Sequence, residues 1–285
     1  VGPRRVAVVT GTRADFGLLR TVMAAVEAHD ELELMVIAAG AHLIQPATTY
    51  REVKKAFGVR VVDSVPMQVA GRVGRWADVE SLGKGVARFG RSFERLRPDW
   101  VVVLGDRIEA FAAASAASVG GVPVAHLHGG DRAEGVADEA MRHAITKLAH
   151  LHLAATAASA ERVSKMGEPE ERIEVVGSPA IDGLGSIGPL SDADFAELGS
   201  PEAVVLLHPI GRDDEAEEHA ATQVLAGVFE AMVTALTDQI EEEFDAGGDS
   251  AYERLVSSIS ASRARIASGA YDAQRLVIQA LMQGS

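Results

Sequence analysis

Seven short runs of apolar and β-branched residues recur along the first two thirds of the chain. They cover residues 5–11, 33–40, 59–65, 100–106, 122–129, 151–156 and 173–178, with amphipathic stretches such as 16–30 and 77–98 between them. Near-continuous apolar strands that alternate with helices are typical of a parallel sheet covered on both faces. We therefore predict an α/β fold with a doubly wound parallel sheet, whose ligands bind beyond the carboxyl ends of the strands.

The 285 residues, 47% of them apolar, are enough for one large or two ordinary domains. Residues 1–184 hold the seven strands and are predicted to form a Rossmann-like domain with the functional site. Residues 185–202 are punctuated by Gly, Ser and Pro and are predicted to be a linker. Residues 203–285 begin with one further strand (203–209) and a helix from about 214 to 237. Only helical patterns follow, so this second domain is expected to be partial α/β and then helical.

Charge and cysteine content exclude several classes of function. The net charge of −14 argues against nucleic acid, whose binding depends on Lys and Arg. Sixteen acidic residues against one basic residue, Arg212, fall between 191 and 250, which indicates a solvated acidic surface. The absence of cysteine excludes disulfides, thiolate catalysis and Cys-ligated zinc. No apolar run approaches the roughly 18 residues of a membrane span, and no signal peptide is recognised, so the cytoplasm is the expected compartment.

The first strand ends in a loop that suits an anion. In VVTGTRADFGLLR the strand ends at Gly11, the loop carries Arg13 and Asp15, and a helix is expected to start near Phe16. The backbone N–H groups at such a helix start point toward whatever lies over the strand, which favours a phosphate. An ordinary β–α turn with Asp15 as N-cap explains the same residues equally well.

A second strand end carries more charge. In WVVVLGDRIEAF, Asp106 follows the strand directly, and Arg107 and Glu109 share the turn that leads into a helix. The carboxyl ends of parallel strands form the ligand crevice, so a site is favoured here over a simple N-cap at Asp106.

Five of the nine histidines lie between residues 126 and 152. His126 and His128 are two apart on an expected strand, which predicts that they point to one face. Gly129 and Gly130 follow and let the backbone turn close to a ligand. Two HxH pairs also allow a metal site completed by a carboxylate, but no HExxH pairing accompanies them, and no metal is expected.

The segment ADEAMRHAITKLAH is predicted to be a helix. Its apolar stripe is Met141, Ala144, Ile145 and Leu148, and Glu139, His143, Thr146 and His150 face away. Asp138 and Arg142 lie one turn apart at the edge of the stripe, where they reach a cleft or form a plain i,i+4 ion pair. His150 and His152 are predicted to be buried, hydrogen-bonded imidazoles, and His208 ends a strand on the crevice side.

Taken in order, TGTRADFGLL, AGAHL, VLGDRIEAFAAASAA, VPVAHLHGGDRAEG, DEAMRHAITKLAHLH and ERIEVVGSPAID resemble the hydrolysing UDP-N-acetylglucosamine 2-epimerases of sialic-acid precursor synthesis. The resemblance covers about residues 4–184. It implies a GT-B architecture of two Rossmann-like domains and a UDP-sugar substrate, with no metal or redox cofactor and with homo-oligomers, commonly dimers or tetramers.

The resemblance also implies a two-step reaction. UDP leaves C1 by anti elimination with loss of the C2 proton, and water then adds to give N-acetylmannosamine and free UDP. Asp106 and Asp138 become the acid/base carboxylates, and Arg142 fixes the sugar or orients Asp138. Asp131 also belongs to the catalytic set. The expected substrate-binding residues are Arg13, Asp15, His42, Arg107, Glu109, His128, Gly129, Gly130, Glu139 and His208.

The sequence departs from the family after residue 209. The serine-rich GNSSSG-type loop that holds the nucleotide is not found, so the C-terminal half is expected to be truncated or divergent. The substrate could be UDP-N-acetylglucosamine or UDP-diacetylbacillosamine. The alternatives are a catalytically impaired nucleotide-sugar-binding module of the same fold and a GT-B glycosyltransferase.

Overall fold

The computed structural model describes residues 2–45, 48–132, 138–182, 187–201, 204–207 and 214–247; for residues 48, 138, 214 and 232–247 only the helical backbone is described. The chain divides into two compact units, residues 1–191 and 192–285. None of the described helices combines the length and apolar character that a membrane span requires.

The first unit is a seven-stranded parallel sheet, and all seven strands predicted from the sequence are confirmed. The strands are β1 (Arg4–Thr10), β2 (Leu32–Ala39), β3 (Val61–Val65), β4 (Trp100–Leu104), β5 (Val124–Leu127), β6 (Leu151–Ala154) and β7 (Ile173–Val175). Their order is β3-β2-β1-β4-β5-β6-β7. The order reverses between β1 and β4, which makes the carboxyl ends of these two strands the topological switch point.

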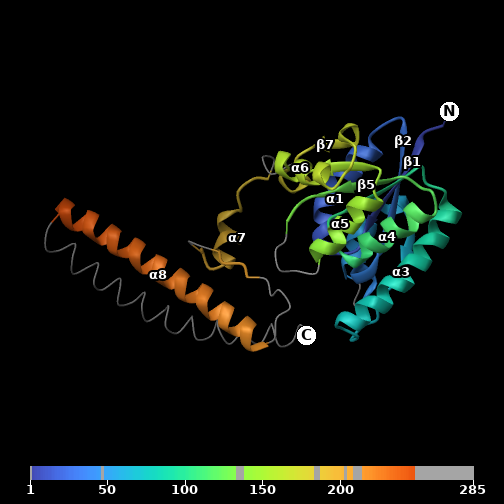
Figure 1. The fold of residues 1–285 in the computed structure, drawn as a ribbon. Helices are drawn as coiled ribbons and strands as arrows, with labels where there is room; N and C mark the ends of the chain where they lie inside the picture. Colours follow the sequence, from blue (N-terminus) through green and yellow to red (C-terminus); the bar gives the residue numbers. More distant parts are fainter. Residues whose placement is uncertain are drawn as a thin grey trace. The chain divides into compact units, whose positions relative to one another are not determined.

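Helices connect the strands and cover both faces of the sheet. They are α1 (Arg13–Glu27), α2 (Thr48–Phe57), α3 (Arg75–Leu96), α4 (Ile108–Val119), α5 (Asp138–Leu148) and α6 (Ala157–Lys165), with short 3-10 turns η1 (Gly40–Leu43), η2 (Gly58–Arg60), η3 (Glu170–Arg172) and η4 (Pro179–Ile181). Helices α3, α4 and α5 lie side by side in Figure 1. The doubly wound α/β class is therefore confirmed.

Alternation along the strands builds two apolar cores. On β1, Ala7 and Val9 pack into one core with Phe89 and Phe93 of α3, whereas Val6 and Val8 face the other. Leu19 and Met23 of α1 fill that second core. Successive side chains of a strand point to opposite faces, so a strand buried on both sides needs the continuous apolar runs seen in this sequence.

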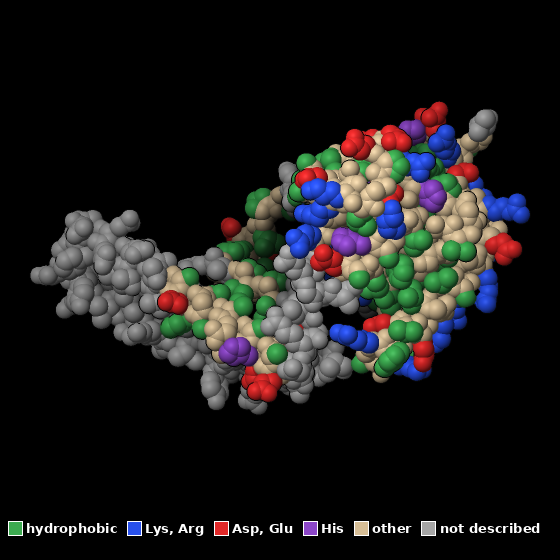
Figure 2. All heavy atoms as spheres, viewed as in Figure 1, with side chains coloured by type: hydrophobic (Ala, Val, Ile, Leu, Met, Phe, Trp, Pro, Cys, Tyr) green, Lys and Arg blue, Asp and Glu red, His purple; other side chains and the backbone are tan. Residues whose placement is uncertain are grey.

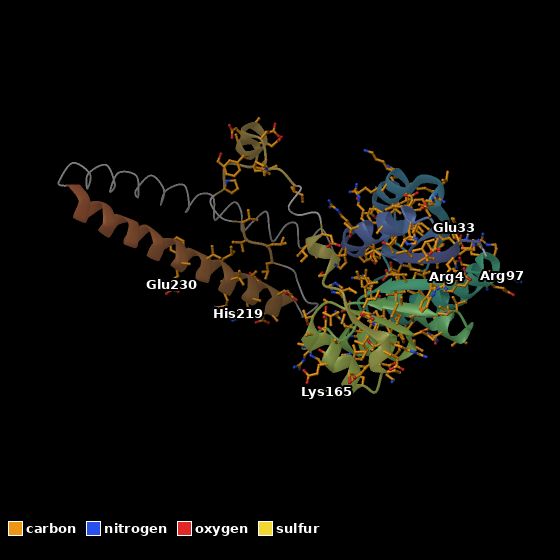
Figure 3. The ribbon with its side chains drawn as sticks, turned by 90° about the horizontal axis from the view of Figure 1, so that it is seen from above. Arg4, Glu33, Arg97, Lys165, His219 and Glu230 are labelled. Atoms are coloured by element: carbon orange, nitrogen blue, oxygen red, sulfur yellow. The ribbon has the colours of Figure 1, made fainter. Side chains whose placement is uncertain are left out.

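The amino ends of the strands lie at the edge opposite the switch point. Figure 3 labels Arg4, the first residue of β1, Glu33, the second residue of β2, and Arg97 near them. On the face shown in Figure 2, acidic and basic side chains are interspersed over the first unit. This face therefore has no continuous patch of purely acidic or purely basic side chains.

The second unit differs from the sequence prediction at two points. Residues 204–207, within the predicted strand 203–209, form neither strand nor helix and are 43–83% exposed. An apolar run forms a strand only where neighbouring strands complete its hydrogen bonds. The predicted linker contains a short helix, α7 (Asp192–Glu197), whose first turn carries Asp192 and Asp194, a favourable placement for acidic residues. The predicted helix from 214 is present as α8 (Asp214–Gly247).

Candidate active site

A charged cluster lies where β4 and β5 end. Asp106 lies two residues after the end of β4, and Nη2 of Arg142, one turn into α5, donates to its Oδ2. Nη1 of the same guanidinium lies 3.7 Å from Oδ2 of Asp131. These three side chains are only 12–24% exposed. Arg142 therefore bridges two carboxylates that belong to different loops.

His128 joins the same cluster through Asp131. Its Nδ1 lies 2.9 Å from Oδ2 of Asp131, and Ser159 of α6 donates to Oδ1 of Asp131 over 2.6 Å. His128 has a φ of +63°, a left-handed conformation that is uncommon outside glycine. Such backbone strain concentrates at functional sites, where the surroundings hold it in place.

The same turn requires a glycine at position 130. Its φ is +78°, and a Cβ there would lie 2.2 Å from the carbonyl oxygen of Ser159. Arg162 of α6 donates to the Gly130 carbonyl. The close approach of α6 to this turn thus holds Asp131 in reach of both His128 and Arg142.

The loop after β1 forms a second, more buried cluster. Asp15 accepts hydrogen bonds from the Thr10 hydroxyl at 2.7 Å and from the N–H groups of Gly11 and Thr12 at 2.9 and 3.0 Å. Burial raises the pKa of Asp15, whereas those hydrogen bonds act in the opposite direction. The suggestion that Asp15 is the N-cap is wrong. Thr12 caps α1, because its hydroxyl accepts the Asp15 N–H while Asp15 binds back in a capping box.

His42 extends this cluster from η1. Its Nε2 lies 2.9 Å from Thr10 Oγ1 and its Nδ1 3.0 Å from Thr49 Oγ1. Burial lowers the pKa of His42 to about 4, although the carboxylates of Glu109 and Glu52 favour the charged ring. His42 is therefore a neutral, buried neighbour of the first loop.

Glu109 lies beneath the switch point. Its side chain is 1% exposed, and neither carboxylate oxygen has a hydrogen-bond partner among the described residues. Arg107 Nε lies 3.5 Å from Oε2. A Cβ on Gly40, whose φ is +51°, would lie 2.3 Å from Glu109 Oε1, and one on Gly11 would lie 2.6 Å from its Cγ. Because Gly11 and Gly40 have no side chain, the Glu109 carboxylate fits between the ends of β1, β2 and β4.

An open groove of about 430 Å³ lies beside the cluster. Residues of α3, α4 and α5 and of the segment before α3 line it: Gln68, Arg75, Asp78, Val79, Leu82, Arg107, Ile108 and Met141. Arg107 and Met141 are the sequence neighbours of Asp106 and Arg142. The groove therefore adjoins the charged cluster.

The histidine-rich run separates into structural and site residues. β5 ends at Leu127, so the alternation argument does not extend to His128. His126 is fully buried against the Gly105 carbonyl at 2.8 Å and Thr146 Oγ1 at 3.3 Å, and burial lowers its pKa to about 4. Thr146 does not face away as predicted. It is completely buried, its Oγ1 lies 3.3 Å from Nδ1 of His126, and its hydroxyl donates to the Arg142 carbonyl over 3.0 Å.

The predictions for the last two histidines have different outcomes. His152 is fully buried and lies 3.2 Å from Glu168 Oε2, and burial lowers its pKa. His150 is exposed, so its predicted burial is wrong. It stands at the turn before β6, where Nδ1 accepts the Val124 N–H at 3.3 Å.

The predicted site residues are only partly brought together. Asp106, His128, Asp131 and Arg142 are linked by direct contacts, with Gly129 and Gly130 in the connecting turn. Arg13 is exposed on the first turn of α1, and Glu139 lies 3.6 Å from His143 on α5. The side chain of Asp138 and all of His208 lie outside the described residues. Arg142 is therefore seen to orient Asp106 and Asp131, and its predicted pairing with Asp138 stays a prediction.

The sequence did not single out Ser159, Arg162 or Ser178. Ser178 Oγ lies 3.1 Å from His128 Nε2. The only available signal was that Ser178 follows the last strand, at the crevice edge of the sheet. Ser159 and Arg162 carry no such signal, because only packing of α6 brings them to the turn. Among the described residues, no group of three His, Asp or Glu side chains is arranged to hold a metal ion.

The fold and these contacts define a Rossmann-like domain with charged groups at the carboxyl ends of its central strands. A profile of the UDP-N-acetylglucosamine 2-epimerase family matches residues 24–256. The chain belongs to this family, which confirms the resemblance found in the sequence.

Curated proteins that are similar in sequence have names that place them in the same family. The chain is similar to the UDP-N,N'-diacetylbacillosamine 2-epimerase (hydrolyzing) of Legionella pneumophila, with 41% identity over 63% of this chain and 47% of that protein. It is 32% identical to the UDP-N-acetylglucosamine 2-epimerase of Neisseria meningitidis over 80% of this chain and 59% of that protein. The chain thus spans about half the length of the curated relatives it matches.

Solved structures share the fold. A crystal structure of a UDP-N-acetylglucosamine 2-epimerase aligns with a TM-score of 0.61 at 22% identity, over 69% of this chain and 55% of that one. The Neisseria meningitidis enzyme bound to UDP-GlcNAc aligns with a TM-score of 0.56 at 23% identity, over 64% and 49%. These likenesses support the GT-B-type domain.

Proposed function

We propose that this chain carries the sugar site of a hydrolysing nucleotide-sugar 2-epimerase, which converts UDP-N-acetylglucosamine to N-acetylmannosamine and UDP. The observation that carries the proposal is the contact of Asp106, Arg142, Asp131 and His128 at the carboxyl ends of β4 and β5. The names of the Legionella and Neisseria relatives support the class of substrate.

The chemistry needs the residue types found there. The C2 proton is weakly acidic, so a base must be held close to it in a partly buried site. The departing diphosphate needs cations and N–H donors, for which the α1 start with Arg13, and Arg107 beside the groove, are available. Nε of Arg142 is buried without a hydrogen-bond partner among the described residues, which leaves a donor for a sugar hydroxyl or for Asp138.

A diacetamido sugar is a second candidate substrate. The Legionella relative is named for UDP-N,N'-diacetylbacillosamine, and its identity with this chain is the higher of the two. Leu82, Ile108 and Met141 give the groove an apolar part that suits a deoxy, acetamido-substituted ring. The homo-oligomer and the cytoplasmic location stay predictions, and size-exclusion chromatography with light scattering tests the first.

The test is incubation of the chain with each UDP-sugar while UDP release is followed. UDP release with either sugar alone supports the epimerase. Saturable binding without release would favour a binding module, and release only with an added acceptor would favour a glycosyltransferase.

A further inference from the structure

Three side chains form a continuous hydrogen-bond chain at the edge of the site. Ser178 Oγ lies 3.1 Å from Nε2 of His128, and Nδ1 of His128 lies 2.9 Å from Oδ2 of Asp131. The serine stands just after β7, and the other two stand in the turn after β5. Ser178 thus contacts the imidazole of a residue that lies 50 positions earlier in the chain.

The hydrogen-bonding roles of the neighbours constrain the ring. The Asp131 carboxylate accepts, so Nδ1 of His128 carries a proton and donates. In the neutral ring Nε2 then has a lone pair, to which the Ser178 hydroxyl can donate. Ser178 Oγ in turn accepts the Ala180 N–H over 3.2 Å. In serine hydrolases a carboxylate likewise orients an imidazole, whose other nitrogen acts as the base toward a neighbouring hydroxyl.

Three carboxylate oxygens around His128 are already engaged. Both oxygens of Asp131 accept hydrogen bonds, from His128 and Ser159, and Oδ2 of Asp106 accepts one from Arg142. Among the described groups of this cluster, Nε2 of His128 contacts only the Ser178 hydroxyl, which can rotate away from it. The His128 side chain is 17% exposed, so a substrate can reach it.

We propose that His128 is a proton-transfer residue of the epimerase reaction, oriented by Asp131 and by Ser178. The inference rests on the proposed function and deepens it. In the elimination step the C2–H electron pair forms the C1=C2 bond, and the C1–O pair leaves with UDP. The C2 proton moves to Nε2 of His128, which then releases it to solvent.

Inversion at C2 requires a second group on the other face of the sugar. That acid returns a proton to C2, water supplies hydroxide to C1, and the proton released by the water restores the acid. Asp106 and Asp138 are the candidates for this second group. Asp131 and Ser178 act through the imidazole and are positioning residues.

Chemical rescue of His128→Gly tests the proposal. Glycine adopts a φ of +63° without strain, so this variant removes the ring and spares the turn. We expect UDP release to fall by roughly 10²–10⁴-fold and to recover in part with added imidazole. His150→Gly, at an exposed histidine of the opposite strand end, is the control and should keep its rate with or without imidazole.

The outcomes separate the two proposals. If His128→Gly folds and keeps the rate of the unmodified chain, the role of His128 is overturned. A loss of rate that imidazole leaves unchanged has the same consequence. Neither result contradicts the proposed function. An unmodified chain that releases no UDP from either sugar would overturn the proposed function and the role of His128 with it.

A second measurement does not depend on the fold of the glycine variant. Nitrogen NMR of the histidine-labelled chain should show the Nδ1–H tautomer for His128, assigned by its loss in His128→Asn. Asp131→Asn and Ser178→Ala should each disturb that signal and lower kcat more than they raise KM. An Nε2–H tautomer in the unmodified chain would contradict the proposal.

Discussion

Arg142 on α5 donates to the carboxylate of Asp106 after β4, although 36 positions separate them in the sequence. Nη1 of the same guanidinium lies 3.7 Å from Asp131, so one side chain sets the position of two carboxylates. A planar guanidinium can hold two acceptors at fixed angles, which an ammonium group cannot.

Arg142→Ala should therefore lower kcat/KM more than Arg142→Lys does. We expect kcat/KM to fall by roughly 10²–10³-fold for alanine, because the two carboxylates lose their common partner, and by less for lysine. A double-mutant cycle with Asp131→Asn, whose carboxylate lies 3.7 Å from Nη1 of Arg142, checks the coupling through steady-state UDP release. Additive effects of the two changes would show that the contact has no part in turnover.

Asp106→Asn should abolish turnover and leave the fold intact. The amide keeps an oxygen that accepts from Arg142 but no longer carries a charge or takes up a proton. Circular dichroism and UDP release measure the two effects. Asp63→Asn is the matched control, because Asp63 also binds an arginine, Arg95, but lies on β3 away from the cluster. Turnover of Asp106→Asn at the rate of the unmodified chain would remove Asp106 from the mechanism.

Gly130→Ala should destabilise the first unit more than Gly167→Ala. Both glycines have left-handed φ values, +78° and +86°, so both variants carry backbone strain of about 1–3 kcal/mol. Only at residue 130 would the new Cβ meet an atom, the Ser159 carbonyl oxygen; at residue 167 nothing lies within 4 Å. Urea denaturation measures the difference. Equal losses would mean that α6 does not constrain this turn.

Stability should decrease as the pH falls from about 6.5 toward 4. Burial lowers the pKa of His126 to about 4 in the folded chain, from 6.5 in the unfolded one. Within this window the unfolded chain binds the additional proton, so unfolding is favoured as the pH falls, and the effect levels off below pH 4. His42 acts in the same direction, since burial lowers its pKa to about 4 as well.

His126→Gln tests the sign of this effect. Between pH 7 and pH 4.5 its free energy of unfolding should change by about 2 kcal/mol less than that of the unmodified chain. His150→Gln, at an exposed position, should keep the full change. An unaltered pH dependence in His126→Gln would show that His126 is not held neutral by burial.

The sheet could be predicted because each buried strand needs its own apolar run, as in residues 100–104 and 124–127. Position at the carboxyl ends also indicated Asp106 and His128 as candidate site residues, which the structure places in one cluster. The contact of Arg142 with Asp106 could not be predicted, because it depends on the packing of α5 against α4, whereas the i,i+4 spacing indicated only Asp138. Ser159 and Ser178 depend on how α6 and the chain after β7 pack, which no local pattern encodes.

The reaction itself is tested most directly by NMR of the product formed from UDP-N-acetylglucosamine in D₂O. If the chain eliminates UDP and then hydrates the glycal, N-acetylmannosamine should carry one deuterium at C2, delivered from solvent. Product with hydrogen retained at C2, or an intact UDP-sugar after prolonged incubation with the folded chain, would contradict the account.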